Sequence, residues 1–200
     1  MRLFKEGNVI SPLALTYLNV EVPTRLISSY SNVLTQREEY NLGCREVDEL
    51  NDFLKKVRLP FSDRSVNLAF TSFEESYNMN NPAFSLVSYM TGLECLLSDG
   101  GAEKSYKLSR NIAILIGKDK SSSEEIHPDV KSLYKKRSRL VHEGSADITG
   151  EDLRIARNLV RTSIKYYLRA GLSKPELLHK LNSLWYDKKW QWQTSSSDSV

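Results

Sequence analysis

Cysteines are scarce, and no arrangement of residues marks a disulfide framework or a zinc site. Cys44 and Cys95 are the only cysteines among 200 residues, and neither belongs to a CxxC motif or a cluster with histidine. We therefore predict two unpaired thiols, no bound metal and no cofactor, with a disulfide or redox role as the open alternative. Cys95 lies in an apolar run and is expected to be a small buried hydrophobic residue.

Long apolar runs are also missing. No stretch approaches the roughly 20 uninterrupted apolar residues that a membrane-spanning helix needs. Residues 1–7 become charged too early for the apolar region of a signal peptide. We therefore expect a cytoplasmic protein without a membrane partner. The sequence also has no glycine-rich phosphate-binding loop and no Ser/His/Asp arrangement in a recognisable context.

From about residue 44 the hydrophobic residues recur at helical spacing, which predicts an all-α helical bundle over residues 44–187. Residues 1–43 have no sustained period and are predicted to be a poorly structured N-terminal extension with a short strand at 16–22. The serine-rich residues 188–200 are predicted to be a disordered tail. The expected helices cover about 44–59, 63–80, 83–98, 102–117, 129–142, 150–168 and 175–186, with a polar loop over 118–125.

Two of the expected helices place a charged residue on the side that faces the core. The interrupted stripes are Val130, Leu133 and Leu140 around Arg137, and Val87, Met90 and Leu97 around Glu94. A charge on a buried face is costly unless it is paired, so we predict that the two side chains make contact. Two interpretations stay open: a structural ion pair that ties the helices together, or a Glu94 that orients an Arg137 needed for function.

Positive charge is concentrated at the end of the helix that contains Arg137. The overall net charge of +3 is weak evidence for a nucleic-acid partner, so the placement of the charge matters more. A basic last turn is favoured by the helix dipole alone, and an isolated histidine is more often structural than catalytic. However, three features occur together within six residues: the imidazole of His142, the charged Arg137 on the core-facing side, and a basic patch. That combination favours ribonuclease chemistry.

The run from Leu133 to Gly144 resembles the signature helix of HEPN domains, where an arginine is followed after four to six residues by a histidine. Here four residues separate Arg137 from His142, and Ser138 supplies the polar residue that often follows the arginine. The Arg-Ser-x-x-Val-His-x-Gly pattern is similar to the ApeA-like branch, as is Leu-Glu-x-Leu at residues 93–96. The resemblance covers about residues 62–172 and departs from the family at Glu143, where a glycine often follows the histidine.

This resemblance implies a HEPN-like bundle and a metal-independent endoribonuclease. In such enzymes the 2′-hydroxyl of the RNA attacks the phosphate and leaves a 2′,3′-cyclic phosphate. Arg137 and His142 would be catalytic, with Ser138 and Glu94 in supporting roles. The residues predicted to hold the RNA backbone are Lys135, Lys136 and Arg139.

The resemblance also implies a homodimer with a composite active site. Five residues turn a helix by about 500°, so the side chains of Arg137 and His142 point about 140° apart and a twofold partner would bring them together. The implied role is that of a toxin or antiphage-defence effector, with an antitoxin or an N-terminal sensor module as partner. Residues 2–7 are similar to the end of the module that precedes this domain in ApeA-like proteins, which suggests part of a longer protein.

Two other functions stay open. The first is a non-catalytic HEPN module of a larger defence protein that dimerises or holds RNA or nucleotide without cutting it. The second is an unrelated helical interaction protein whose motif is coincidental. His127 and His179 are expected to be exposed and without a role. For Trp185, Trp190 and Trp192, packing against the bundle is favoured over stacking with bases.

Overall fold

The computed structural model describes residues 1–7, 13–18, 25–30 and 40–186, and it divides the chain into two compact units. The first unit is Met1–Val57 and the second is Arg58–Val200. The division follows the first helix, whereas the boundary predicted at residue 44 grouped that helix with the bundle. The predicted disordered tail, residues 188–200, lies outside the described residues.

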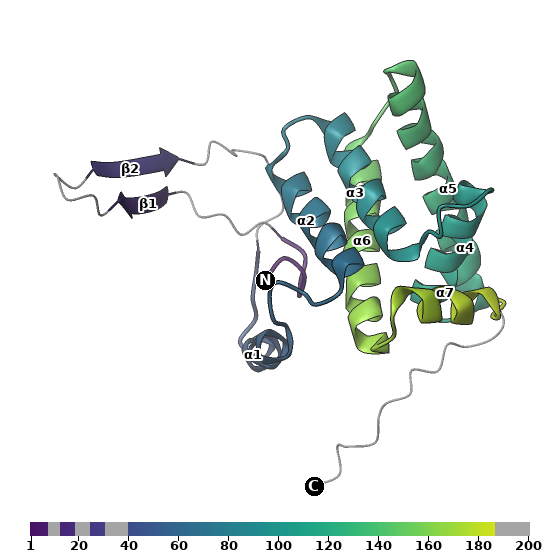
Figure 1. Ribbon diagram of the computed structural model, residues 1–200, viewed down its shortest axis with the longest axis horizontal. Coiled ribbons are helices and arrows are strands. Elements are labelled where there is room, and N and C mark those ends of the chain that lie inside the picture. The colour runs from purple at the N-terminus through teal and green to yellow at the C-terminus, as the bar shows by residue number, and fades with distance from the viewer. Residues whose placement is uncertain (8–12, 19–24, 31–39, 187–200) are drawn as a thin grey trace, which may run out of the picture. The chain divides into compact units, whose positions relative to one another are not determined.

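Within the first unit, two strands form an antiparallel pair (Figure 1). Strand β1 spans Leu13–Leu18 and β2 spans Arg25–Tyr30, with Leu13 opposite Tyr30 and Leu18 opposite Arg25. The strand predicted at 16–22 overlaps β1 at residues 16–18, and its remainder lies outside the described residues. Strand β2 was not predicted.

Helix α1, Glu46–Lys56, packs on the first residues of the same unit. The rings of Phe4 and Phe53 lie 5.6 Å apart, and Lys5 Nζ donates to Glu46 Oε2 at 2.7 Å. Leu50 is buried. The helix predicted from the spacing of its apolar residues is therefore confirmed.

The second unit is a helical bundle (Figure 1), so the predicted all-α fold is confirmed. Helix α3 lies between α2 and α5 and packs on α6, while α4 packs against α5, α6 and α7. The helices are α2 Arg64–Asn78, α3 Pro82–Leu97, α4 Lys104–Ile116, α5 Lys120–Glu143, α6 Gly150–Ala170 and α7 Lys174–Asn182.

The core of the bundle is built from apolar faces that meet on α3. Gly92 lets α2 approach closely, because a Cβ at this position would lie 3.3 Å from the carbonyl oxygen of Ala69. The largest fully buried side chains are Tyr77, Tyr89, Phe73, Leu86, Met90, Leu93, Leu96, Leu97, Leu108, Ile112, Leu115 and Leu133.

Helix ends follow signals that are visible in the sequence. Asp63 caps α2 by accepting hydrogen bonds from the backbone N–H groups of Ser65 and Val66. Thr149 caps α6 and forms a capping box with Asp152. Gly144 follows α5 with a φ of 74°, a left-handed conformation that favours glycine.

The start of α5 differs from the prediction. The segment 118–125 was expected to be a loop, but α5 begins at Lys120 and contains Pro128. Asp119 and Ser122 form a capping box there, and Ser123 donates to the carbonyl oxygen of Ala113 on α4 at 3.1 Å. The helix therefore begins where a cap and a contact with α4 stabilise it, although its first turns lack apolar residues.

Candidate functional site

Arg137 and Glu94 make the predicted contact between α5 and α3. Arg137 Nη2 lies 3.6 Å from Glu94 Oε2, and the two side chains are 22% and 25% exposed. Leu133, one turn before Arg137 on α5, is buried in the core. Arg137 lies on the same side of α5 but is partly exposed, at the edge of the contact between α5 and α3. The predicted contact is confirmed.

This ion pair leaves hydrogen-bonding capacity at its centre. Within the described part of the chain, Arg137 Nε and Glu94 Oε1 are buried atoms without a hydrogen-bond partner. The Arg137 guanidinium also lies 5.9 Å from the centre of the Tyr134 ring, which limits its range of positions. The side chain as a whole remains 22% exposed, so the guanidinium can still donate N–H groups to an anion.

His142 lies in the last turn of α5 and is exposed. Arg137 faces α3, and the rotation along α5 turns His142 away from it. Ser138, the polar residue that follows Arg137, is half-buried. One chain therefore does not bring the guanidinium and the imidazole to a common face.

The three basic residues predicted to hold RNA have different surroundings. Lys136 Nζ lies 2.6 Å from Asp152 Oδ2 and so joins α5 to the first turn of α6. Burial raises the pKa of Asp152, but the hydrogen bonds that its carboxylate accepts, including that from Lys136, together have the larger effect. The pKa of Asp152 is therefore below its ordinary value. Arg139 pairs with the exposed Glu143 at 3.2 Å, and Lys135 is exposed.

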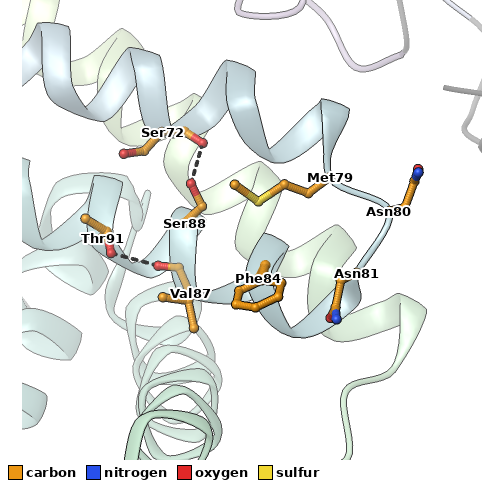
Figure 2. A pocket seen from close by; sticks show the side chains of 8 residues that line it. All are labelled: Ser72, Met79, Asn80, Asn81, Phe84, Val87, Ser88 and Thr91. Carbon is orange, nitrogen blue, oxygen red and sulfur yellow. Dashed lines mark hydrogen bonds between the residues drawn. The ribbon is translucent and has the colours of Figure 1, made fainter. Parts of the chain in front are cut away.

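An open apolar hollow of about 550 Å³ lies on the outer side of α2 and α3 (Figure 2). Phe84, Val87, Thr91 and Glu94 follow one another at helical spacing, so the hollow and the ion pair share a face of α3. Phe84 is 65% exposed. The sequence assigned Val87 to the core stripe, but it is half-buried and lines this hollow. The other lining residues are Ser72, Met79, Asn80, Asn81 and Ser88.

His127 lies in an aromatic cluster, so the prediction that it is exposed is wrong. Its ring centre is 6.0 Å from that of Tyr106 on α4 and 6.2 Å from that of Tyr186 after α7. Its Nε2 is buried and has no hydrogen-bond partner among the described residues. Burial, together with the charge of Lys131, lowers the pKa of His127.

This lowered pKa predicts a loss of stability in acid. The unfolded chain takes up a proton at His127 near its ordinary pKa of about 6.5, before the folded chain does. The free energy of unfolding should therefore fall as the pH drops from 7.5 to 5.5. His127→Gln should make this fall smaller, measured by urea unfolding at both pH values. His179→Gln, a change at an exposed histidine on α7, is the control. An unchanged pH dependence in His127→Gln would contradict the prediction.

Other predicted residues are placed as follows. Cys44 and Cys95 are free, as predicted, and His179 is exposed. Cys95 is half-buried, and burial raises the pKa of its thiol. Trp185 is 68% exposed, which contradicts the expected packing against the bundle. Trp190 and Trp192 lie outside the described residues.

In the described ranges, no group of three or more His, Cys, Asp or Glu side chains is arranged to hold a metal ion. No described helix combines the length and the apolar character required to cross a membrane. Comparisons of the chain with protein-family models, curated proteins and solved structures gave no match.

Proposed function

We propose that the chain is a metal-independent endoribonuclease of the HEPN type, acting as a toxin or antiphage-defence effector. The observation that carries the proposal is Arg137, a half-buried arginine that contacts Glu94 and precedes an exposed histidine by five residues. The role in toxicity or defence follows from the resemblance of this helix to the ApeA-like branch.

The proposed reaction divides its tasks between two side chains. His142 takes the proton of the 2′-hydroxyl as its oxygen bonds to phosphorus, or gives a proton to the 5′-oxygen as its bond to phosphorus breaks, because an imidazole can both accept and donate a proton. Arg137 offsets the negative charge that develops on the phosphate, through a guanidinium that binds two oxygens at once. Lys135 and Arg139 attract the RNA backbone without regard to sequence.

The site requires a second copy of the chain. Because Arg137 and His142 lie on different sides of α5, each active site would combine residues of two protomers related by a twofold axis. Phe84 and Val141 are 65% and 53% exposed, and association would remove such apolar surface from water.

A second candidate function is a module that dimerises or holds RNA or nucleotide without cutting it. The hollow beside Phe84 favours it. This apolar surface lies on the face of α3 that carries Glu94, and it could bind a partner without any catalytic group. In that case RNA binding or dimerisation would be measurable and cleavage would not.

Incubation of labelled single-stranded RNA with the protein in EDTA tests the proposal. We expect cleavage that leaves 2′,3′-cyclic phosphate ends, by a protein that is a dimer in analytical ultracentrifugation at micromolar concentration. Binding without cleavage would support the second candidate. Cleavage abolished by EDTA, or a monomer at the concentration of the assay, would count against the proposed mechanism.

The role of Glu94 can be separated from simple ion pairing by Glu94→Gln. If Glu94 positions Arg137, the cleavage rate should fall on the order of 10-fold, equivalent to about 1.4 kcal/mol. The free energy of unfolding should change by no more than about 1 kcal/mol, because the pair is partly exposed. Cleavage kinetics and urea unfolding of the same preparation measure both effects.

Glu124→Gln is the matched control for this test. Glu124 lies on α5 and pairs with Lys120 at 3.8 Å, a distance similar to that between Arg137 and Glu94. The substitution should leave both the rate and the stability unchanged. A Glu94→Gln protein that is less stable but cleaves at the normal rate would establish the purely structural interpretation.

A further inference from the structure

Three aromatic rings meet where α4, α5 and the segment after α7 come together, and a fourth aromatic residue adjoins them. Helix α4 packs against both α5 and α7 (Figure 1). The ring centre of His127 on α5 lies 6.0 Å from that of Tyr106 on α4 and 6.2 Å from that of Tyr186. Trp185 directly precedes Tyr186 in the chain. These four residues are called here the His127 cluster.

The fold leaves much of the His127 cluster open to solvent. Tyr106 is 50% exposed and Trp185 is 68% exposed, while Tyr186 is half-buried. Exposed aromatic surface is unfavourable in water, so a partner that covers these rings would be stabilised by them. Packing of Trp185 against the bundle was favoured by the sequence and is contradicted by this exposure. Stacking with bases is the alternative that the sequence left open.

The segment after α7, which carries two of these aromatic residues, is anchored on α4 by Arg110. The Arg110 guanidinium donates to the backbone carbonyl oxygens of Leu181 at 3.2 Å and Asn182 at 3.3 Å, and also to that of Leu184. A single side chain therefore fixes the chain on both sides of the end of α7. Rings presented by an anchored segment lose less conformational freedom on binding than rings on a free chain.

One flank of α5 joins the His127 cluster to the proposed active site. This flank carries His127, Lys131, Lys135 and His142, whose spacing of four, four and seven residues keeps them within about 80° around the helix axis and spreads them over about 22 Å. Both lysines are exposed. The acidic residue near Tyr186 is Glu124, and it pairs with Lys120 at 3.8 Å. The flank therefore combines aromatic rings at one end with positive charge along its length.

We propose that the His127 cluster stacks bases of single-stranded RNA whose backbone follows this flank of α5 toward His142. Every base has a π-face, so stacking on aromatic side chains does not depend on sequence. It favours single strands, because the bases of a duplex are already stacked on one another. Lys131 and Lys135 attract the phosphates in between. This inference rests on the proposed function in taking RNA as the ligand, but it assigns base contacts to residues outside the motif.

The test compares two double variants at the exposed members of the His127 cluster. Tyr106→Ala/Trp185→Ala removes both rings, whereas the matched control Tyr106→Phe/Trp185→Phe keeps an aromatic ring at each position. Both are made in the full chain with His142→Ala, so that the RNA stays intact. The anisotropy of a fluorescein-labelled 20-nucleotide oligo(U) is measured between 50 and 200 mM NaCl. An abasic oligonucleotide of the same length provides the same phosphates without bases.

The alanine variant should bind oligo(U) about 10- to 100-fold more weakly than its parent, the loss expected when two bases are no longer stacked. Its slope of log K against log salt should be unchanged, because no phosphate contact is lost. The phenylalanine variant should bind like the parent, and all three proteins should bind the abasic strand equally. Circular dichroism checks folding, and Trp185→Ala alone is used if the double alanine variant is unfolded.

Several results would overturn the inference. These are an alanine variant that binds oligo(U) like its parent, an equal loss of affinity for the abasic strand, an equal loss in the phenylalanine variant, no RNA binding by the parent, or binding only to anionic phospholipid vesicles. RNA cleavage by the wild-type protein is scored separately. Cleavage together with an unaffected alanine variant refutes this inference alone, and ring-dependent RNA binding without cleavage refutes the proposed function alone.

Discussion

Replacing His142 with alanine should lower the rate of RNA cleavage in EDTA by about 10²- to 10⁴-fold, the usual contribution of a positioned general acid or base. His142 is exposed at the end of α5, so its removal should leave the free energy of unfolding within about 0.5 kcal/mol of the wild type. Cleavage of labelled RNA under single-turnover conditions, with excess protein, measures the chemical step. His179→Ala, at the exposed histidine of α7, should cleave at the wild-type rate.

A mixing experiment tests whether the site is composite. His142→Ala lacks the proton-transfer group, and Arg137→Gln lacks the cation, so each dimer alone should be inactive. If one site takes Arg137 from one protomer and His142 from the other, a mixed dimer contains one intact site. After subunit exchange in an equimolar mixture, activity should recover to roughly a quarter of the wild-type value. Activity that stays at the level of the separate variants would show that both residues act within one chain.

The helical bundle was predictable because its helices carry regular apolar stripes and conventional caps. The capping residues Asp63 and Thr149, and Gly144 at the end of α5, mark helix ends through local chemistry alone. The start of α5 could not be found in this way. Its first turns are polar, and the contact of Ser123 with α4 that supports them depends on how the two helices pack.

The candidate site was predictable to the extent that it interrupts a pattern. Arg137 and Glu94 each replace an apolar residue in a stripe, so their contact followed from the cost of burying an unpaired charge. The surroundings of His127 could not be predicted, because Tyr106 and Tyr186 are distant in the sequence and meet it only in the fold.

The largest effect on stability is expected at Phe73, a core residue of α2 whose ring packs against Tyr89 of α3. Phe73 is fully buried, and its ring centre lies 5.2 Å from that of Tyr77 and 6.4 Å from that of Tyr89. Phe73→Ala should lower the free energy of unfolding by about 3–5 kcal/mol, from lost transfer energy and the cavity that remains. Since small domains are stable by only about 5–15 kcal/mol, this is a large fraction of the total.

The same substitution at Phe84 is the control, because Phe84 is 65% exposed on α3. Phe84→Ala should change the free energy of unfolding by no more than about 0.5 kcal/mol when the protein is monomeric. Urea unfolding followed by circular dichroism at 222 nm should show a lower midpoint for Phe73→Ala at an unchanged slope. The side chains that hold Arg157 and Arg161, Tyr89 and Tyr77, pack directly on Phe73. If Phe73→Ala and Phe84→Ala unfolded at the same urea concentration, the packing of Phe73 against Tyr77 and Tyr89 would be wrong as described.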